Sequence, residues 1–180
     1  MEKKENMYFT YGIGEISKEK FKKPNGVSTQ NKIKGGLWCC PKNEFYSEWF
    51  VITLACPDLV RDPIPYDIDI YSNANILKLT SENIDFYTDS NRYIDFNKVK
   101  SYDVIHFSKD LVENIKQFES YYVESLQILN FDIISYKESY IDENYVLSED
   151  FRKKAMPIVE KMYASLLQTD VFKMIQSKEK

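Results

Sequence analysis

The chain has 180 residues, of which 43% are hydrophobic and 15% aromatic, so it is long and apolar enough to fold around its own core. Its net charge is −4, although residues 1–34 carry eight lysines against four glutamates. The acidic remainder argues against general nucleic-acid binding, which needs a broad positive surface. We expect a single domain over residues 1–180.

The N-terminal residues 1–6 lack an apolar core, so no signal peptide is expected. The longest apolar run, 49–56, is far too short to span a bilayer, which makes a membrane partner unexpected. These features predict a cytoplasmic protein. Its cysteines, Cys39, Cys40 and Cys56, should then be reduced, with Cys56 and one of the Cys39/Cys40 pair buried, and no C-x-x-C motif supports a metal site.

Short β-prone runs predict strands along the first two thirds of the chain, at 7–13, 37–40, 66–71, 76–79 and 102–107. The run 66–71 alternates strictly, with Asp67 and Asp69 on the face opposite its isoleucines. These two carboxylates could hold Mg²⁺, but the exposed face of a half-buried strand explains them without a metal. Residues 84–99 resemble a loop with a short helix.

Helices are expected at three places. Asn43 can cap a helix through Phe50, although the β-branched residues 51–53 could instead form a strand. Apolar residues at spacings of three and four predict one amphipathic helix over 111–129. After a strand at 131–136, a C-terminal helix begins near Ser148 or at Pro157. The fold class is therefore α+β, with a mixed sheet core of short strands, a long amphipathic helix and a C-terminal helix.

Two short motifs carry the chemistry that the sequence offers. Tyr11-Gly-Ile-Gly14 follows a strand, but Ser17 replaces the third glycine of a dinucleotide-binding loop. Residues 35–41, Gly-Gly-Leu-Trp-Cys-Cys-Pro, can be a turn into a buried strand, a cysteine site or one wall of a ligand pocket. His106, the only histidine, could activate a neighbouring cysteine, but a half-buried histidine on a strand is the simpler interpretation.

The order of three features resembles that of small ADP-ribosyltransferase-like proteins of bacteria and phages. The features are Phe9-Thr-Tyr-Gly12 ending the first strand, the motif at 35–41, and Tyr-Asp-Val-Ile-His-Phe at 102–107. The stretch 126–135 is also similar to the last strand of such proteins. In that family the first strand carries His or Arg, the second strand carries Ser, and a late strand carries a catalytic Glu. The resemblance implies a cleft that binds NAD⁺ or a related nucleotide.

Carried onto this sequence, the resemblance implies a set of cofactor-binding residues: Tyr11, Gly12, Gly36, Trp38 and Cys40. His106, or Asp103 as a poor substitute, would stand where the catalytic glutamate belongs. The chain departs from the family at each catalytic point, because Thr10 replaces His or Arg and Cys40 replaces Ser. Degraded catalysis is therefore expected; an active protein would transfer ADP-ribose to a macromolecule.

The alternative is a non-enzymatic interaction protein. An acidic body could present negative charge to a basic, nucleic-acid-binding partner, as a phage-encoded inhibitor does. Tyr87, Tyr121 and Tyr145 are candidate contacts, because tyrosine is favoured at interfaces. A homodimer joined through the long helices is a third possibility.

Overall fold

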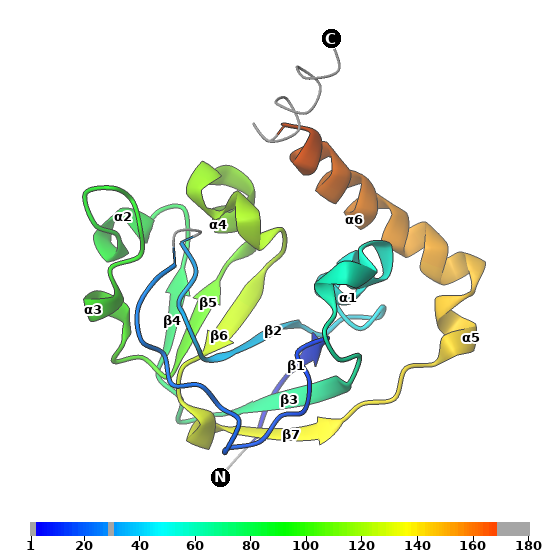
Figure 1. Cartoon of the computed structure of the whole chain (residues 1–180), viewed down its shortest axis with the longest axis horizontal. Helices are drawn as coiled ribbons and strands as arrows, with labels where there is room; N and C mark the ends of the chain where they lie inside the picture. Colours follow the sequence, from blue (N-terminus) through cyan, green and yellow to red (C-terminus); the bar gives the residue numbers. More distant parts are fainter. Residues whose placement is uncertain (1–2, 29–30, 169–180) are drawn as a thin grey trace.

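A computed structural model describes residues 3–28 and 31–168. Its centre is a seven-stranded sheet in the order β4-β5-β6-β2-β1-β3-β7 (Figure 1). The strands are β1 (Lys3–Tyr11), β2 (Leu37–Pro41), β3 (Pro65–Tyr71), β4 (Ile76–Leu79), β5 (Val104–Phe107), β6 (Ser125–Ile128) and β7 (Ile134–Glu138). β4 and β5 are parallel, whereas every other neighbouring pair is antiparallel. The expected α+β class with a mixed sheet is confirmed.

Helices cover the sheet on two sides. The α-helices are α1 (Glu48–Ala55), α2 (Ile84–Tyr87), α3 (Phe96–Val99), α4 (Lys109–Asn114), α5 (Glu143–Val146) and α6 (Glu149–Gln168). Short 3₁₀ turns form η1 (Pro57–Leu59), η2 (Lys116–Tyr121) and η3 (Phe131–Ile133). None of the helices within the described residues is long and apolar enough to cross a membrane.

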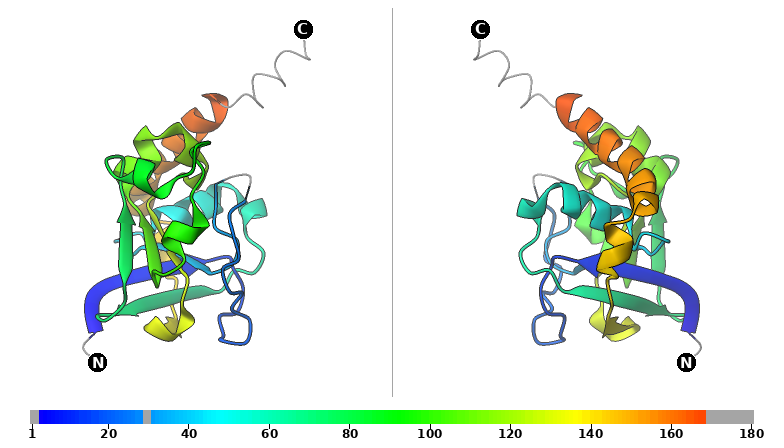
Figure 2. Two further views of the ribbon diagram at one scale, coloured as in Figure 1. Left: turned by 90° about the vertical axis from the view of Figure 1, so that its left-hand side faces the viewer. Right: turned by 90° about the vertical axis from the view of Figure 1, so that its right-hand side faces the viewer.

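The sheet forks between β1 and β2. These strands are in register only at two pairs, Tyr8 with Pro41 and Phe9 with Cys40. Beyond the fork β1 continues beside β3, while β2 continues beside β6. The two halves therefore run in different directions, with β4, β5 and β6 steeply inclined above β3 and β7 (Figures 1 and 2).

Separate apolar clusters hold the two halves in place. Ile68 of β3 and Leu126 of β6 are completely buried between the halves. The outer face of β5 packs through Phe107 against α2, α3 and α4. On the other half, Phe9 of β1 packs against Phe50 of α1 and against α6. The fork thus has a helical layer on each side of it.

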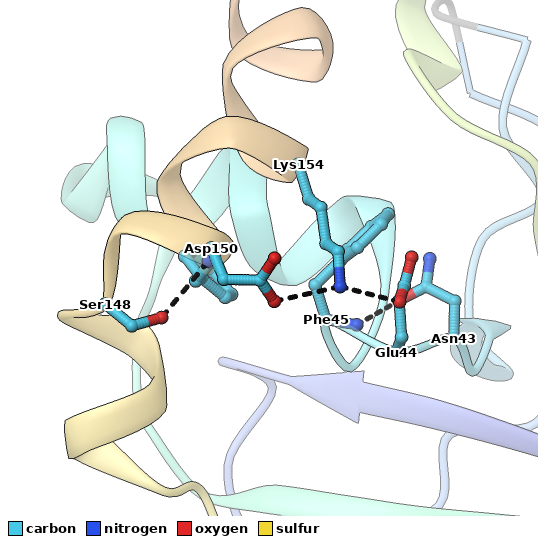
Figure 3. Close-up of polar contacts among 7 residues, drawn as sticks. Asn43, Glu44, Phe45, Ser148, Asp150 and Lys154 are labelled. Atoms are coloured by element: carbon cyan, nitrogen blue, oxygen red, sulfur yellow. Dashed lines mark hydrogen bonds and ion pairs between the residues drawn. The ribbon is translucent and has the colours of Figure 1, made fainter.

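The C-terminal helix α6 begins at one of the two predicted positions. The Ser148 hydroxyl accepts a hydrogen bond of 3.1 Å from the backbone amide three residues later, so it is the N-cap, and Pro157 lies inside the helix. Lys154 ties α6 to the segment before α1. Its ammonium group lies 2.8 Å from the carboxylate of Glu44 and 2.9 Å from that of Asp150 (Figure 3).

The first helix starts later than predicted. Ser47, rather than Asn43, caps α1, because its hydroxyl accepts a hydrogen bond of 3.1 Å from the amide of Phe50. Residues 51–53 are helical and buried against the sheet, so the strand alternative for them is wrong. The strands predicted at 37–40, 66–71 and 76–79 are confirmed.

The predicted helix over 111–129 is wrong. The segment instead forms α4, η2 and β6, although Leu111, Phe118 and Leu126 are buried as the pattern requires. All four residues of β6 are buried, so this strand shows no alternation to distinguish it from a helix. A homodimer through a long helix at this position loses its structural basis.

Candidate functional site

A cavity of about 210 Å³ opens where β1 and β2 diverge. Ten residues from β1, β2, β6, α1, η2 and the loops beside them line it: Thr10, Ile13, Lys32, Trp38, Cys39, Cys40, Trp49, Tyr121, Val123 and Ser125. None of these lining residues carries a carboxylate, and Lys32 is the only charged one among them. We call this space the fork cavity.

Aromatic side chains fix one wall of the fork cavity. Trp38 stacks on Phe107 with 5.6 Å between the ring centroids, and the edge of Tyr121 meets it at 5.5 Å. The Tyr121 hydroxyl donates a hydrogen bond of 2.7 Å to the carbonyl oxygen of Asn31, which immobilises the ring. A second tryptophan, Trp49, donates from Nε1 to the carbonyl oxygen of Tyr11 at 3.3 Å. Rigid aromatic surfaces of this kind suit a planar ligand.

Ser125, which lines the same cavity, carries an unused polar group. The residue is 6% exposed, and its hydroxyl has no hydrogen-bond partner within the described part of the chain. Buried polar groups are nearly always hydrogen-bonded, so an unpartnered hydroxyl at a cavity wall needs an explanation. A hydroxyl can both donate and accept, and it could therefore bind an amide, a carbonyl or a sugar hydroxyl.

Lys32 supplies an unused charge. Its ammonium nitrogen lies 5.4 Å from the centroid of the Tyr121 ring, and no carboxylate in the described residues is within ion-pair distance of it. The side chain is half-buried, and this burial lowers the pKa of its ammonium group.

Lys42, another half-buried lysine, differs from Lys32 in having a carboxylate partner, because its ammonium group lies 2.5 Å from Asp67. Asp67 is thus buried in an ion pair rather than exposed as predicted.

Of the five predicted cofactor-binding residues, only Trp38 and Cys40 line the fork cavity. Tyr11 packs its ring edge-on against Phe50 with 5.0 Å between the centroids. Gly12 and Gly36 do not line the cavity, and their role is in the conformation of the backbone. A Cβ atom on Gly36 would lie 2.6 Å from a carbonyl oxygen of β6. Position 36 must therefore be glycine for β2 to enter the sheet beside β6.

The two predicted catalytic residues lie elsewhere. His106 pairs in register with Leu126, whereas Trp38 pairs with Gln127, so the histidine is on the opposite face of the sheet from Trp38. Its Nε2 lies 2.6 Å from the carboxylate of Glu124, and this hydrogen bond lowers the pKa of Glu124. The structure does not bring this pair into the fork cavity.

Asp103 is at the start of β5 and has a structural role. Its carboxylate accepts hydrogen bonds from the amide of Asn75 at 2.9 Å and from the side chain of Asn130 at 2.8 Å. These bonds join the beginnings of β4 and β5 to the chain that follows β6. The residue does not line the fork cavity.

The cysteines give the site no nucleophile. Burial raises the pKa of the Cys40 thiol, and nearby Glu48 and Glu124 raise it further. Burial also raises the pKa of Cys39 far above its usual range. Both groups therefore remain protonated near neutral pH, and protonated thiols are poor nucleophiles and poor metal ligands. The described residues contain no group of three or more His, Cys, Asp or Glu side chains that could hold a metal ion.

A larger open groove of about 650 Å³ lies beside the fork cavity and shares Val123 with it. Four charged side chains on its rim are already engaged in ion pairs, because Lys109 lies 3.4 Å from Glu48 and Lys161 is paired with Glu113. The groove contains neither of the unpartnered groups found in the fork cavity.

The chain matches no protein-family model, no curated protein and no solved structure among those compared. The function must therefore be inferred from the fork cavity. Ser125 and Lys32 have no signal in the sequence that marks them as site residues. Tyr121, predicted as an exposed contact, is 4% exposed and forms part of the cavity wall, so that prediction is wrong.

Proposed function

We propose that the protein binds NAD⁺ or a related nucleotide through its nicotinamide end in the fork cavity, as an ADP-ribosyltransferase-like protein with degraded catalysis. The observation that carries this proposal is that Ser125, a residue lining the cavity, has a buried hydroxyl with no partner among the described residues. A carboxamide offers both a donor and an acceptor to such a hydroxyl. Trp38 and Tyr121 offer aromatic surface to the ring.

The size and position of the cavity support this choice of ligand. Its volume of about 210 Å³ is below the roughly 300–1,000 Å³ of pockets for drug-sized ligands, so one ring with its sugar would fill it. The remainder of a dinucleotide would lie outside. The resemblance in the sequence implies a nucleotide between the first strand, the second strand and a late strand. Thr10 of β1, Trp38 of β2 and Ser125 of β6 meet at this cavity.

The absence of a carboxylate among the described lining residues favours binding over transfer. A negative group stabilises the cation-like sugar as nicotinamide leaves, and removing such electrostatic stabilisation costs a reaction orders of magnitude in rate. Glu124 is adjacent to Ser125 in sequence, but its carboxylate is engaged by His106 on the other face of the sheet. We therefore expect nicotinamide release to be very slow.

Calorimetric titration of the purified chain with NAD⁺ tests the proposal. We expect micromolar binding that weakens about tenfold in Ser125→Ala, because one hydrogen bond is lost. Ser108→Ala is the matched control, since Ser108 is also buried but does not line the cavity. No binding at millimolar NAD⁺ would reject the proposal and favour the interaction protein. A chromatographic assay for free nicotinamide then measures any remaining catalysis.

A further inference from the structure

We infer that the fork cavity selects a ligand with an anionic group, and that Lys32 binds the phosphate of a mononucleotide whose ring lies against Trp38. This inference rests on the proposed function, because it names the part of the nucleotide that the same cavity recognises. It assigns a binding role to a lysine in the loop between β1 and β2, outside every motif in the sequence.

The position of Lys32 is fixed by the fold. Its backbone amide donates a hydrogen bond of 3.2 Å to the hydroxyl of Ser28. The preceding residue, Asn31, is 2% exposed, and its side-chain oxygen accepts a hydrogen bond of 2.7 Å from the amide of Ile94. Tyr121 bonds to the backbone of the same asparagine. These bonds anchor the backbone of residues 31–32 beside the cavity that Lys32 lines.

No carboxylate among the described residues compensates the charge of Lys32. Lysine is seldom buried without a partner, because the loss of hydration is unfavourable unless an opposite charge replaces it. The Tyr121 ring face offsets part of this loss through a cation–π contact. No described residue that lines the cavity supplies an anion. A phosphate from the ligand would provide the missing partner, and it would form charge-assisted hydrogen bonds with the ammonium group.

The two unpartnered groups indicate a ligand with two different ends. Ser125 is a neutral hydroxyl suited to a carboxamide, whereas Lys32 is a cation suited to a phosphate. Both border one cavity of about 210 Å³. A nicotinamide mononucleotide carries both groups on one sugar, whereas the riboside lacks the anion and inorganic phosphate lacks the ring.

Titration of the full chain with nicotinamide mononucleotide, nicotinamide riboside and inorganic phosphate tests the inference. We expect the mononucleotide to bind about 10- to 100-fold more tightly than the riboside, as charge-assisted hydrogen bonds predict. Lys32→Met should abolish this difference by weakening binding of the mononucleotide and not of the riboside, whose ring is itself cationic, and Lys32→Arg should preserve it. Lys34→Met, two residues away at an exposed position, should behave as the wild type.

The outcomes separate the two proposals. Equal affinity of the wild type for mononucleotide and riboside would overturn the role of Lys32 but keep the cavity as a ring-binding site. Retention of the phosphate preference in Lys32→Met would also overturn it. Failure of both the mononucleotide and the riboside to bind would reject the proposed function, and this inference with it. Thermal unfolding of Lys32→Met serves as a check on folding, and we expect no loss of stability because an unpartnered half-buried charge has been removed.

Discussion

Replacing Ser125 by alanine should leave the stability of the protein unchanged or raise it, although the residue is buried in the central sheet. Its hydroxyl has no hydrogen-bond partner in the described chain, so the side chain contributes little beyond packing. A buried hydroxyl without a partner costs about 1–3 kcal/mol relative to one in water. The small void left by the oxygen offsets part of the gain. We expect a change between zero and about 1 kcal/mol in favour of folding.

Ser108 provides the comparison, because it is a serine of similar burial with its hydroxyl in use. The two residues are 3% and 6% exposed, respectively. The Ser108 hydroxyl lies 2.7 Å from the carbonyl oxygen of Leu79 and within hydrogen-bond distance of the carboxylate of Asp110, so its one proton serves two acceptors. Hydrogen bonds from Ser108 and from Ser81 lower the pKa of Asp110 to about 2. Replacement of Ser108 by alanine leaves these acceptors short of a partner and should cost about 1–3 kcal/mol.

Urea unfolding of the two variants without ligand, followed by tyrosine and tryptophan fluorescence, measures the difference. The free energies of unfolding should differ by about 1–4 kcal/mol, with Ser108→Ala the less stable. Equal losses in both variants would show that the Ser125 hydroxyl has a partner in solution. That result would remove the observation on which the proposed function depends.

Three further predictions concern the fold. Gly36→Ala should destabilise the protein more than Gly26→Ala: both residues have positive φ, which alone costs alanine about 1–3 kcal/mol, but only a Cβ on Gly36 would meet a carbonyl oxygen, at 2.6 Å. Urea unfolding of the two variants measures the difference. Phe50→Ala should cost about 3–5 kcal/mol and lower the melting temperature sharply, whereas Phe86→Ala, at a side chain 71% exposed, should change it little. The hydrogen bond from the His106 imidazole lowers the pKa of Glu124, so the ionised carboxylate stabilises the protein at neutral pH and this stabilisation is lost as the pH falls below about 4.5. E124Q should make the stability less dependent on pH in this acidic range, which a series of melting curves measures.

The strands that the sequence predicts correctly share clear local signals. Residues 66–71 alternate apolar and polar side chains, and residues 37–40 are enclosed by a glycine pair and a proline. Ser148 was recognisable as a helix cap for the same reason, since capping depends on contacts within one turn. Local sequence signals were therefore sufficient to predict the fold class, an α+β domain with a mixed sheet.

The errors arise where tertiary contacts decide. The segment 111–129 has apolar residues at helical spacing, yet β6 is buried on both faces between β2 and β5, where periodicity cannot separate a strand from a helix. Ser125 was consequently placed on a helix, away from any site. Lys32 reaches the cavity only because its loop is anchored to Tyr121, which is far away in sequence. No local pattern encodes either position.

The fork in the sheet gives these two features a common origin. β1 and β2 separate beyond the pair formed by Phe9 and Cys40. The side chains of the two strands therefore cannot fill the space between them as they would in a continuous sheet. A core with no ligand would favour an apolar residue at 125 and a solvated lysine at 32. Within the described residues, this small cavity is instead lined by a serine whose hydroxyl has no hydrogen-bond partner and a lysine that has no carboxylate partner, and both groups are costly in isolation. A bound nucleotide would compensate both at once, which is why we assign the function to this cavity rather than to the larger groove beside it.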